Sequence, residues 1–149
     1  MAVFEILSPA WMEQYQAIIR NGAAGEDLSA SQFSMYEMFK NVPVRLQHGR
    51  GPDVMFGFRI VDGRIEFPER PWEGATFALT ADFEAIAPWA DLPTEQTRAV
   101  GVMERLAKAG KLQFSGDFAT APAFFHRLNL HDRLAEITAP YVAAPTWGA

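Results

Sequence analysis

A β-hairpin signal near the middle of the chain is the feature that most constrains the fold. Residues 54–61 alternate Val, Phe, Phe and Ile with Met, Gly, Arg and Val, which is typical of a strand with one strongly apolar face. Asp62-Gly63 follows, a dipeptide that favours a two-residue hairpin turn. Residues 64–67 then continue as the returning strand. Strands joined by such a turn pair antiparallel, so the sequence predicts an antiparallel sheet.

Further elements are predicted on both sides of this hairpin. The expected strands are 42–48, 54–61, 64–67, 75–80 and 112–115, and residues 1–7 are either a short strand or an arm. The expected helices are 8–22, 29–40, 83–89, 94–109, about 120–128 and 132–137, each with its apolar side chains at helical spacing. The predicted fold class is α+β, with a single antiparallel, mostly meander sheet of about five strands covered on one face by helices.

A short stretch late in the chain joins a helix, a strand and a second helix with almost no loop. Gly110 ends the first helix, and Leu112 and Phe114 form the apolar face of the strand. Gly116 ends that strand, and Asp117 is expected to cap the helix that follows. If the fold contains a cavity, this last helix is expected to form one of its walls.

Composition supports one folded domain over residues 1–149. Hydrophobic residues make up 49% of the chain, including twelve Phe and four Trp, which is enough to build a core and to line a cavity. The net charge is −5 and there is no Lys/Arg cluster, so nucleic acid is not an expected partner. The absence of cysteine excludes disulfides and thiolate chemistry. No signal peptide or membrane span is predicted, and the expected location is cytoplasmic.

The polar side chains give little indication of catalysis or of a cofactor. His126 and His131 are five residues apart and do not form a helical metal-binding pair, so no metal and no cofactor is predicted. Asp82 and Asp117 are best explained as helix caps. Arg59 could hold a ligand carboxylate at a pocket mouth, but a cross-strand pair with Glu66 is favoured.

Two segments of the chain resemble the sterol carrier protein family of lipid-binding domains. They are residues 78–83 (Ala-Leu-Thr-Ala-Asp-Phe) and residues 110–117 (Gly-Lys-Leu-Gln-Phe-Ser-Gly-Asp), and the hairpin fits the same pattern. The resemblance extends over about 42–130, which would place helices at 8–40 before this core and a tail after it. It implies a sheet covered by helices, with an apolar tunnel for a fatty acyl, sterol-like or polyprenyl lipid and no catalytic residue.

The expected function is therefore non-enzymatic binding or transfer of a hydrophobic ligand. Two alternatives stay open: a protein-interaction or accessory module, for example in quinone or lipid metabolism, and a small enzyme acting on a hydrophobic substrate. A transient membrane or enzyme partner and a dimer are also compatible with the sequence. The predicted ligand-binding residues are apolar and lie on faces expected to meet between helices and sheet: Met35, Phe39, Phe56, Phe58, Trp89, Met103, Phe118, Phe125 and Leu128.

Overall fold

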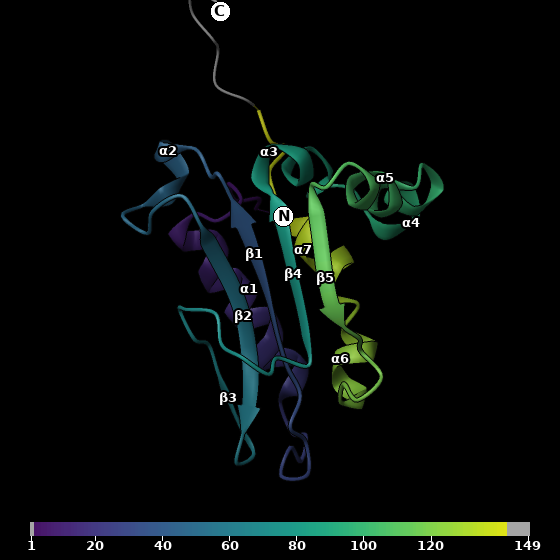
Figure 1. Cartoon of the computed structure of the whole chain (residues 1–149). Helices are drawn as coiled ribbons and strands as arrows, with labels where there is room; N and C mark the ends of the chain where they lie inside the picture. The colour runs from purple at the N-terminus through teal and green to yellow at the C-terminus, as the bar shows by residue number, and fades with distance from the viewer. Residues whose placement is uncertain (1, 143–149) are drawn as a thin grey trace, which may run out of the picture.

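Five strands form one mixed sheet in the computed structural model, which describes residues 2–142 (Figure 1). The strands are β1 Ser34–Lys40, β2 Val54–Val61, β3 Arg64–Glu66, β4 Phe77–Asp82 and β5 Leu112–Gly116, in the order β3-β2-β1-β4-β5. Three of the four pairs are antiparallel, and β1 and β4 run parallel. The α+β class is thus confirmed, but the meander covers only β1 to β3. Residues 143–149, at the end of the expected tail, lie outside the described part.

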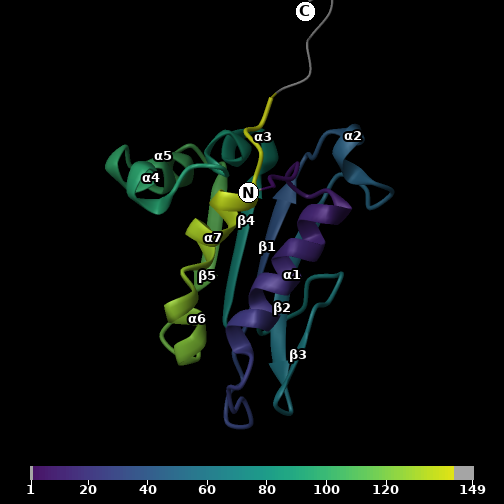
Figure 2. The ribbon, with the colours of Figure 1, turned by 180° about the vertical axis from the view of Figure 1, so that it is seen from behind.

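The helices gather on one face of this sheet. They are α1 Pro9–Ala23, α2 Val44–Gln47, α3 Phe83–Ile86, the 3-10 turn η1 Ala87–Trp89, α4 Thr94–Ala99, α5 Val102–Lys108, α6 Ala123–Leu128 and α7 Leu130–Ile137. Figure 2 shows α1, α6 and α7 lying across this face, with α4 and α5 near the start of β5. The opposite face is crossed by the connection from β3 to β4 (Figure 1).

The predicted hairpin is confirmed in detail. Val61 pairs with Arg64, and only Asp62 and Gly63 lie between the two strands. Both turn residues have positive φ, 50° and 76°, which is the geometry of the primed turns whose twist matches that of the strands. The pair between Arg59 and Glu66 is also confirmed, with Nε and Oε1 2.8 Å apart. This local chemistry fixes the strand register without help from the rest of the fold.

The predicted helix over 29–40 is wrong, because most of this segment is the central strand β1. Its apolar side chains fit both a helical and an alternating period, and periodicity alone does not separate the two. Met35 and Phe39 are buried on the face that the helices cover. Tyr36 lies on the other face, where the Trp72 ring packs against it at a centroid distance of 5.1 Å. A strand covered on both faces has little need of polar residues.

The predicted strand over 42–48 is also wrong. Its alternating apolar residues are spaced so that Val42 and Leu46 also lie one helical turn apart. These two side chains are buried, whereas Val44 between them is 82% exposed. The segment forms the short helix α2, and His48 and Gly49 end it with positive φ. Pro43 at the N-cap position is compatible with this helix start.

The late helix–strand junction confirms two predictions and corrects a third. Gly110 ends α5 with φ 72°, and the Lys111 N–H donates to the Leu106 carbonyl oxygen at 2.9 Å, as in a Schellman motif. β5 follows as predicted. Asp117, however, accepts a hydrogen bond from the Ala119 N–H within the loop, and α6 begins only at Ala123. Asp82 does occupy an N-cap position, but its carboxylate accepts from Asn41 rather than from the helix.

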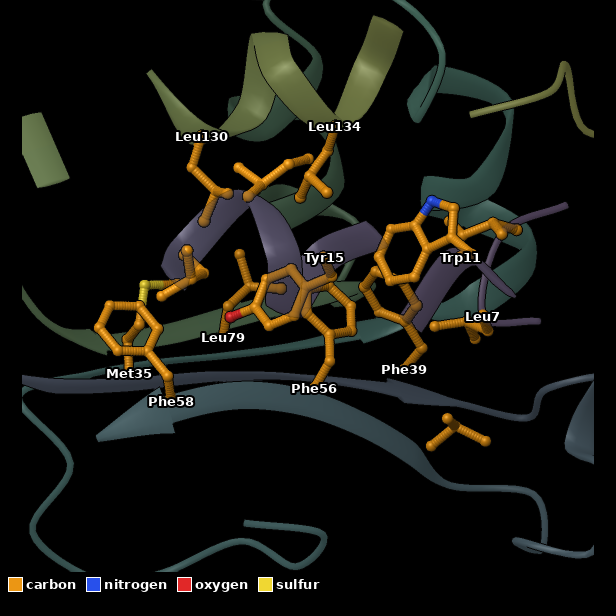
Figure 3. Packing of buried hydrophobic residues seen from close by; sticks show 14 of the residues in the cluster. Leu7, Trp11, Tyr15, Met35, Phe39, Phe56, Phe58, Leu79, Leu130 and Leu134 are labelled. Atoms are coloured by element: carbon orange, nitrogen blue, oxygen red, sulfur yellow. The ribbon is translucent and has the colours of Figure 1, made fainter. Parts of the chain in front are cut away.

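The core lies between α1 and the sheet (Figure 3). Ser8 caps α1 by accepting a hydrogen bond from the Trp11 N–H at 3.1 Å, and Pro9 opens the helix, as the sequence predicts. The helix then buries Trp11 and Tyr15 against Phe56 of β2, with each ring centroid 5.0 Å from that of Phe56. Leu130 and Leu134 of α7 come down onto the same layer (Figure 3).

Candidate functional site

An apolar cavity of about 110 Å³ lies between the helices and the middle of the sheet. Its floor comes from three adjacent strands, through Glu37 and Phe39 of β1, Phe56 of β2 and Leu79 of β4. The remaining walls come from the N-terminal segment, α1, α3, η1, α4, α5 and α7, through Ile6, Trp11, Ile86, Trp89, Ala90, Thr97, Val102, Met103, His131, Leu134 and Thr138. Segments distant in sequence therefore meet around one space.

Glu37 is the acidic member of this lining, and strand geometry explains its position. It is the middle residue of β1 and lies between Met35 and Phe39 on the helix-facing side. Its register partners are Phe56 on one neighbouring strand and Leu79 on the other. The carboxyl group therefore emerges from a floor that is otherwise apolar. The sequence prediction missed this residue because a helix was expected over the segment.

Burial changes the ionisation of Glu37 and of the nearby Tyr15. Removal from water raises the pKa of Glu37 from its ordinary value of 4.5 to about 7. The pKa of Tyr15 is also raised, first by burial and then by the negative charge of Glu37. The Tyr15 hydroxyl is buried and has no hydrogen-bond partner among the described residues. The polar part of the cavity floor is thus a carboxyl whose pKa lies near 7, and Tyr15 lines a second hollow rather than this cavity.

The other polar groups around the cavity are already satisfied. The Trp11 Nε1–H donates to Thr138 Oγ1 at 2.9 Å, and the Thr138 hydroxyl donates to the Leu134 carbonyl oxygen at 2.6 Å. The Thr97 hydroxyl donates to the Thr94 carbonyl oxygen at 3.0 Å. His131 is exposed, and its Nε2 lies 3.0 Å from the Leu92 carbonyl oxygen. These groups hold the walls together rather than point free donors at the cavity.

Four of the nine predicted ligand-binding residues line this cavity: Phe39, Phe56, Trp89 and Met103. The other five do not. Phe58, Phe118 and Phe125 pack with Phe33 at the other end of the core, at centroid distances from 5.3 to 6.3 Å. Met35 is buried, and Leu128 is partly buried against that core. The cavity wall expected from α6 is instead supplied by α7.

The pair α4–α5 covers the cavity loosely. A single helix was predicted here, but Gly101 adopts φ 64° and divides it in two. α4 has no buried residue, and α5 has one, Val102. Val100 and Met103 are each 41% exposed, and Met103 also lines the cavity. Few buried contacts therefore resist an outward movement of this pair.

A second, wider hollow follows the edge of β2. Its volume is about 860 Å³, and it runs between α1 and residues 67–71, beside the half of β2 that β3 does not pair. It is open, and its lining includes charged side chains such as Arg50, Asp53 and Glu69. The smaller cavity is the better candidate for an apolar ligand because its lining is mostly apolar and its walls come from both layers.

Residues 2–142 contain neither a metal-binding cluster of side chains nor a membrane-spanning helix. No group of three or more His, Asp or Glu side chains in this range is arranged to hold a metal ion. None of the helices in this range has both the length and the apolar character required to cross a bilayer.

The solved structures described below share 17% identity or less with this chain. No family model matches the sequence, and no curated protein matches it significantly. The chain is similar to the solution structure of TT1886, a conserved hypothetical protein of Thermus thermophilus, with 17% identity and a TM-score of 0.45 over 99% of this chain and 97% of that one. It is similar to a crystal structure of sterol carrier protein 2, with 16% identity and a TM-score of 0.46 over 90% and 100%.

A third similar structure is UbiJ-SCP2, a ubiquinone synthesis protein. It shares 12% identity and a TM-score of 0.41 over 87% of this chain and 93% of that one. At these values, the similarity by itself identifies neither a family nor a ligand.

Proposed function

We propose that this protein binds an apolar small molecule or lipid in the cavity above β1, β2 and β4, and that it does so without catalysis. The observation that carries the proposal is the mostly apolar cavity between the sheet and the helices. Pockets of this kind, with few polar groups, are typical of binding sites for hydrophobic ligands. The resemblance of residues 78–83 and 110–117 to lipid-binding domains supports the same class of ligand.

The size of the cavity restricts how a lipid can bind. A cavity of about 150 Å³ is known to accept benzene, so a space of about 110 Å³ holds about four or five carbon atoms. A longer chain must extend through the opening or push α4–α5 outward. The exposed Val100 and Met103 at this end would contact such a chain. Each buried methylene contributes about 0.8 kcal/mol, so longer chains should bind more tightly if they stay covered.

The enzymatic alternative needs a titratable group at the cavity, and Glu37 and His131 meet that condition. It also needs a group that the acid or base can activate. The Thr97 and Thr138 hydroxyls donate to carbonyl oxygens of their own chain, and neither is hydrogen-bonded to Glu37 or His131 within residues 2–142. Within that range, the cavity therefore lacks a nucleophile hydrogen-bonded to a base, which covalent catalysis requires. Binding without reaction is the function that the site supports best.

Ala90→Leu tests this proposal by adding three carbon atoms at the cavity wall. Ala90 lines the cavity, so the variant should weaken the binding of a fluorescent fatty-acyl or polyprenyl probe by at least about tenfold, because the probe loses space. Ala99→Leu is the matched control, since Ala99 is exposed on α4 and lies outside the cavity lining. Equal affinities in both variants and the parent protein would place the probe elsewhere. Mass spectrometry of the recovered probe should show it chemically unchanged.

A further inference from the structure

The cavity has a polar point on its floor that a purely apolar ligand would leave unused. Glu37 stands among Met35, Phe39, Phe56 and Leu79 on the central strand. No hydrogen bond or ion pair to its carboxyl is found within residues 2–142. The three salt bridges of this range join Arg45 to Glu5, Arg59 to Glu66 and Arg127 to Glu26, all away from the cavity.

The groups that face this carboxyl are almost all uncharged. On β2 and β4 they are Phe56 and Leu79, and on α7 the lining includes Leu134 and the exposed His131. The lining from α3, η1, α4 and α5 carries no Asp, Glu, Lys or Arg. α1 contributes Trp11, whose Nε1–H is already donated to Thr138, while Tyr15 of the same helix lines the wider hollow instead. The lining therefore contains no arginine or lysine to receive an anionic ligand head.

From this placement we infer that Glu37 determines specificity, and that the cavity selects an apolar alcohol over the corresponding carboxylic acid. This inference rests on the proposed function. A ligand hydroxyl can donate a hydrogen bond to an ionised carboxylate and can accept one from a protonated carboxyl, so it satisfies Glu37 in either state. A ligand carboxylate in the same place would set two like charges together in an apolar site.

The inferred pose puts the hydroxyl on the floor and the hydrocarbon toward the opening. Glu37 lies on the central strand, whereas Met103 is a partly exposed member of the lining. About four or five carbon atoms fill the space between floor and opening, by the volume given above. A longer tail would leave past α5. In this pose the ligand hydroxyl is buried and the end of its tail is accessible. The cavity should therefore select more strongly for the head group of the ligand than for the length of its chain.

Calorimetric titration with 1-octanol, octanoate and octylamine, three probes of equal chain length, tests the inference. At about pH 8.5, where Glu37 is ionised, octanol should bind at least about tenfold more tightly than octanoate. At about pH 5.5 this preference should shrink, because the carboxyl is then protonated. In Glu37→Gln the ratio of octanol affinity to octanoate affinity at about pH 8.5 should fall by about tenfold, since an amide carries no charge. Glu136→Gln, at an exposed carboxylate of α7, is the control and should keep the full preference.

The outcomes separate this inference from the function on which it rests. Equal binding of octanol and octanoate to the parent protein, or the same preference in Glu37→Gln, would overturn the inference and leave the proposed cavity binding in place. Tighter binding of octylamine than of octanol would also overturn it, in favour of a cationic ligand. Absence of binding by all three probes would contradict the proposed function itself. Glu37→Leu keeps the bulk of the side chain and removes its hydrogen bonding. This variant should bind octanol about tenfold more weakly, without a similar loss for the other two probes.

Discussion

Replacing Glu37 with glutamine should stabilise the protein, and the gain should depend on pH. Glutamine has the shape of the protonated carboxyl but cannot ionise. The pKa of Glu37 is about 7 in the folded chain and near 4.5 when the side chain is in water. Between these values the unfolded chain has lost the proton while the folded chain still holds it. Raising the pH through this range therefore lowers the free energy of unfolding of the parent protein.

The size of the effect follows from the two pKa values. Their difference corresponds to about 3 kcal/mol, the cost of ionising this carboxyl in its partly buried position. Below about pH 4.5 both chains hold the proton and the cost is absent; above about pH 7 the cost is complete. Glu37→Gln should match the parent protein at the acid end. At about pH 8.5 it should exceed the parent by up to about 3 kcal/mol.

Urea unfolding curves of both proteins at about pH 4.5, about pH 6 and about pH 8.5 provide the measurement. Titration of all other groups is common to both chains, so it cancels in the difference between them. Glu136→Gln serves as the control, because Glu136 is exposed and its replacement should leave the difference close to zero. A difference for Glu37→Gln that stays constant across the three pH values would refute the account of Glu37 as a partly buried carboxyl that ionises near neutrality.

Two further substitutions test the packing that shapes the cavity. Gly57→Ala should destabilise the fold by about 3 kcal/mol in urea unfolding, since a Cβ there would lie 2.3 Å from the Met35 carbonyl oxygen. Gly74→Ala has open space at the same point and should cost only about 1 kcal/mol, through its φ of 79°; a larger loss there would contradict the steric explanation. Trp11→Phe should lower stability by about 1–3 kcal/mol, because it removes the buried hydrogen bond to Thr138, and an unchanged unfolding midpoint would show that this bond contributes nothing.

The elements predicted correctly are those whose signals are local. Asp62-Gly63 forms the hairpin turn because both residues tolerate positive φ. The alternating apolar residues on either side of the turn indicate the two strands. Ser8-Pro9 starts α1 through a hydrogen bond three residues away. Gly110 ends α5 for the same kind of reason. Each of these signals acts within one turn of chain, so the sequence alone is sufficient to identify them.

The errors occur where distant parts of the chain decide the structure. β1 was predicted as a helix because its apolar residues fit two periods, and only the neighbouring strands and Trp72 select the extended form. Glu37 was missed for this reason, since its place on the cavity floor depends on β2 and β4 being its neighbours. Asp117 was predicted as a helix cap, but Pro122 delays the helix and leaves Asp117 in a loop.

The candidate site was predictable as a kind of surface rather than as a set of residues. The composition indicated enough apolar and aromatic side chains to build a core and also to line a cavity. Four of the nine expected residues do line the cavity. Trp11, Leu79 and Leu134 were not among those nine, because spacing along a helix or strand shows that a residue is buried but not what it faces. Phe118 and Phe125 were expected at the cavity, and they pack with Phe33 at the opposite end of the core instead.

Nuclear Overhauser contacts between bound 1-octanol and the methyl groups of the protein would test the central claim most directly. The account predicts contacts from the hydrocarbon chain to the Leu79 and Leu134 methyl groups, which lie on opposite walls of the cavity. Leu46 is equally buried but lies outside the cavity lining, so its methyl groups should show none. Contacts confined to exposed residues such as Val100 and Phe114, with none to Leu79 or Leu134, would contradict binding inside the fold.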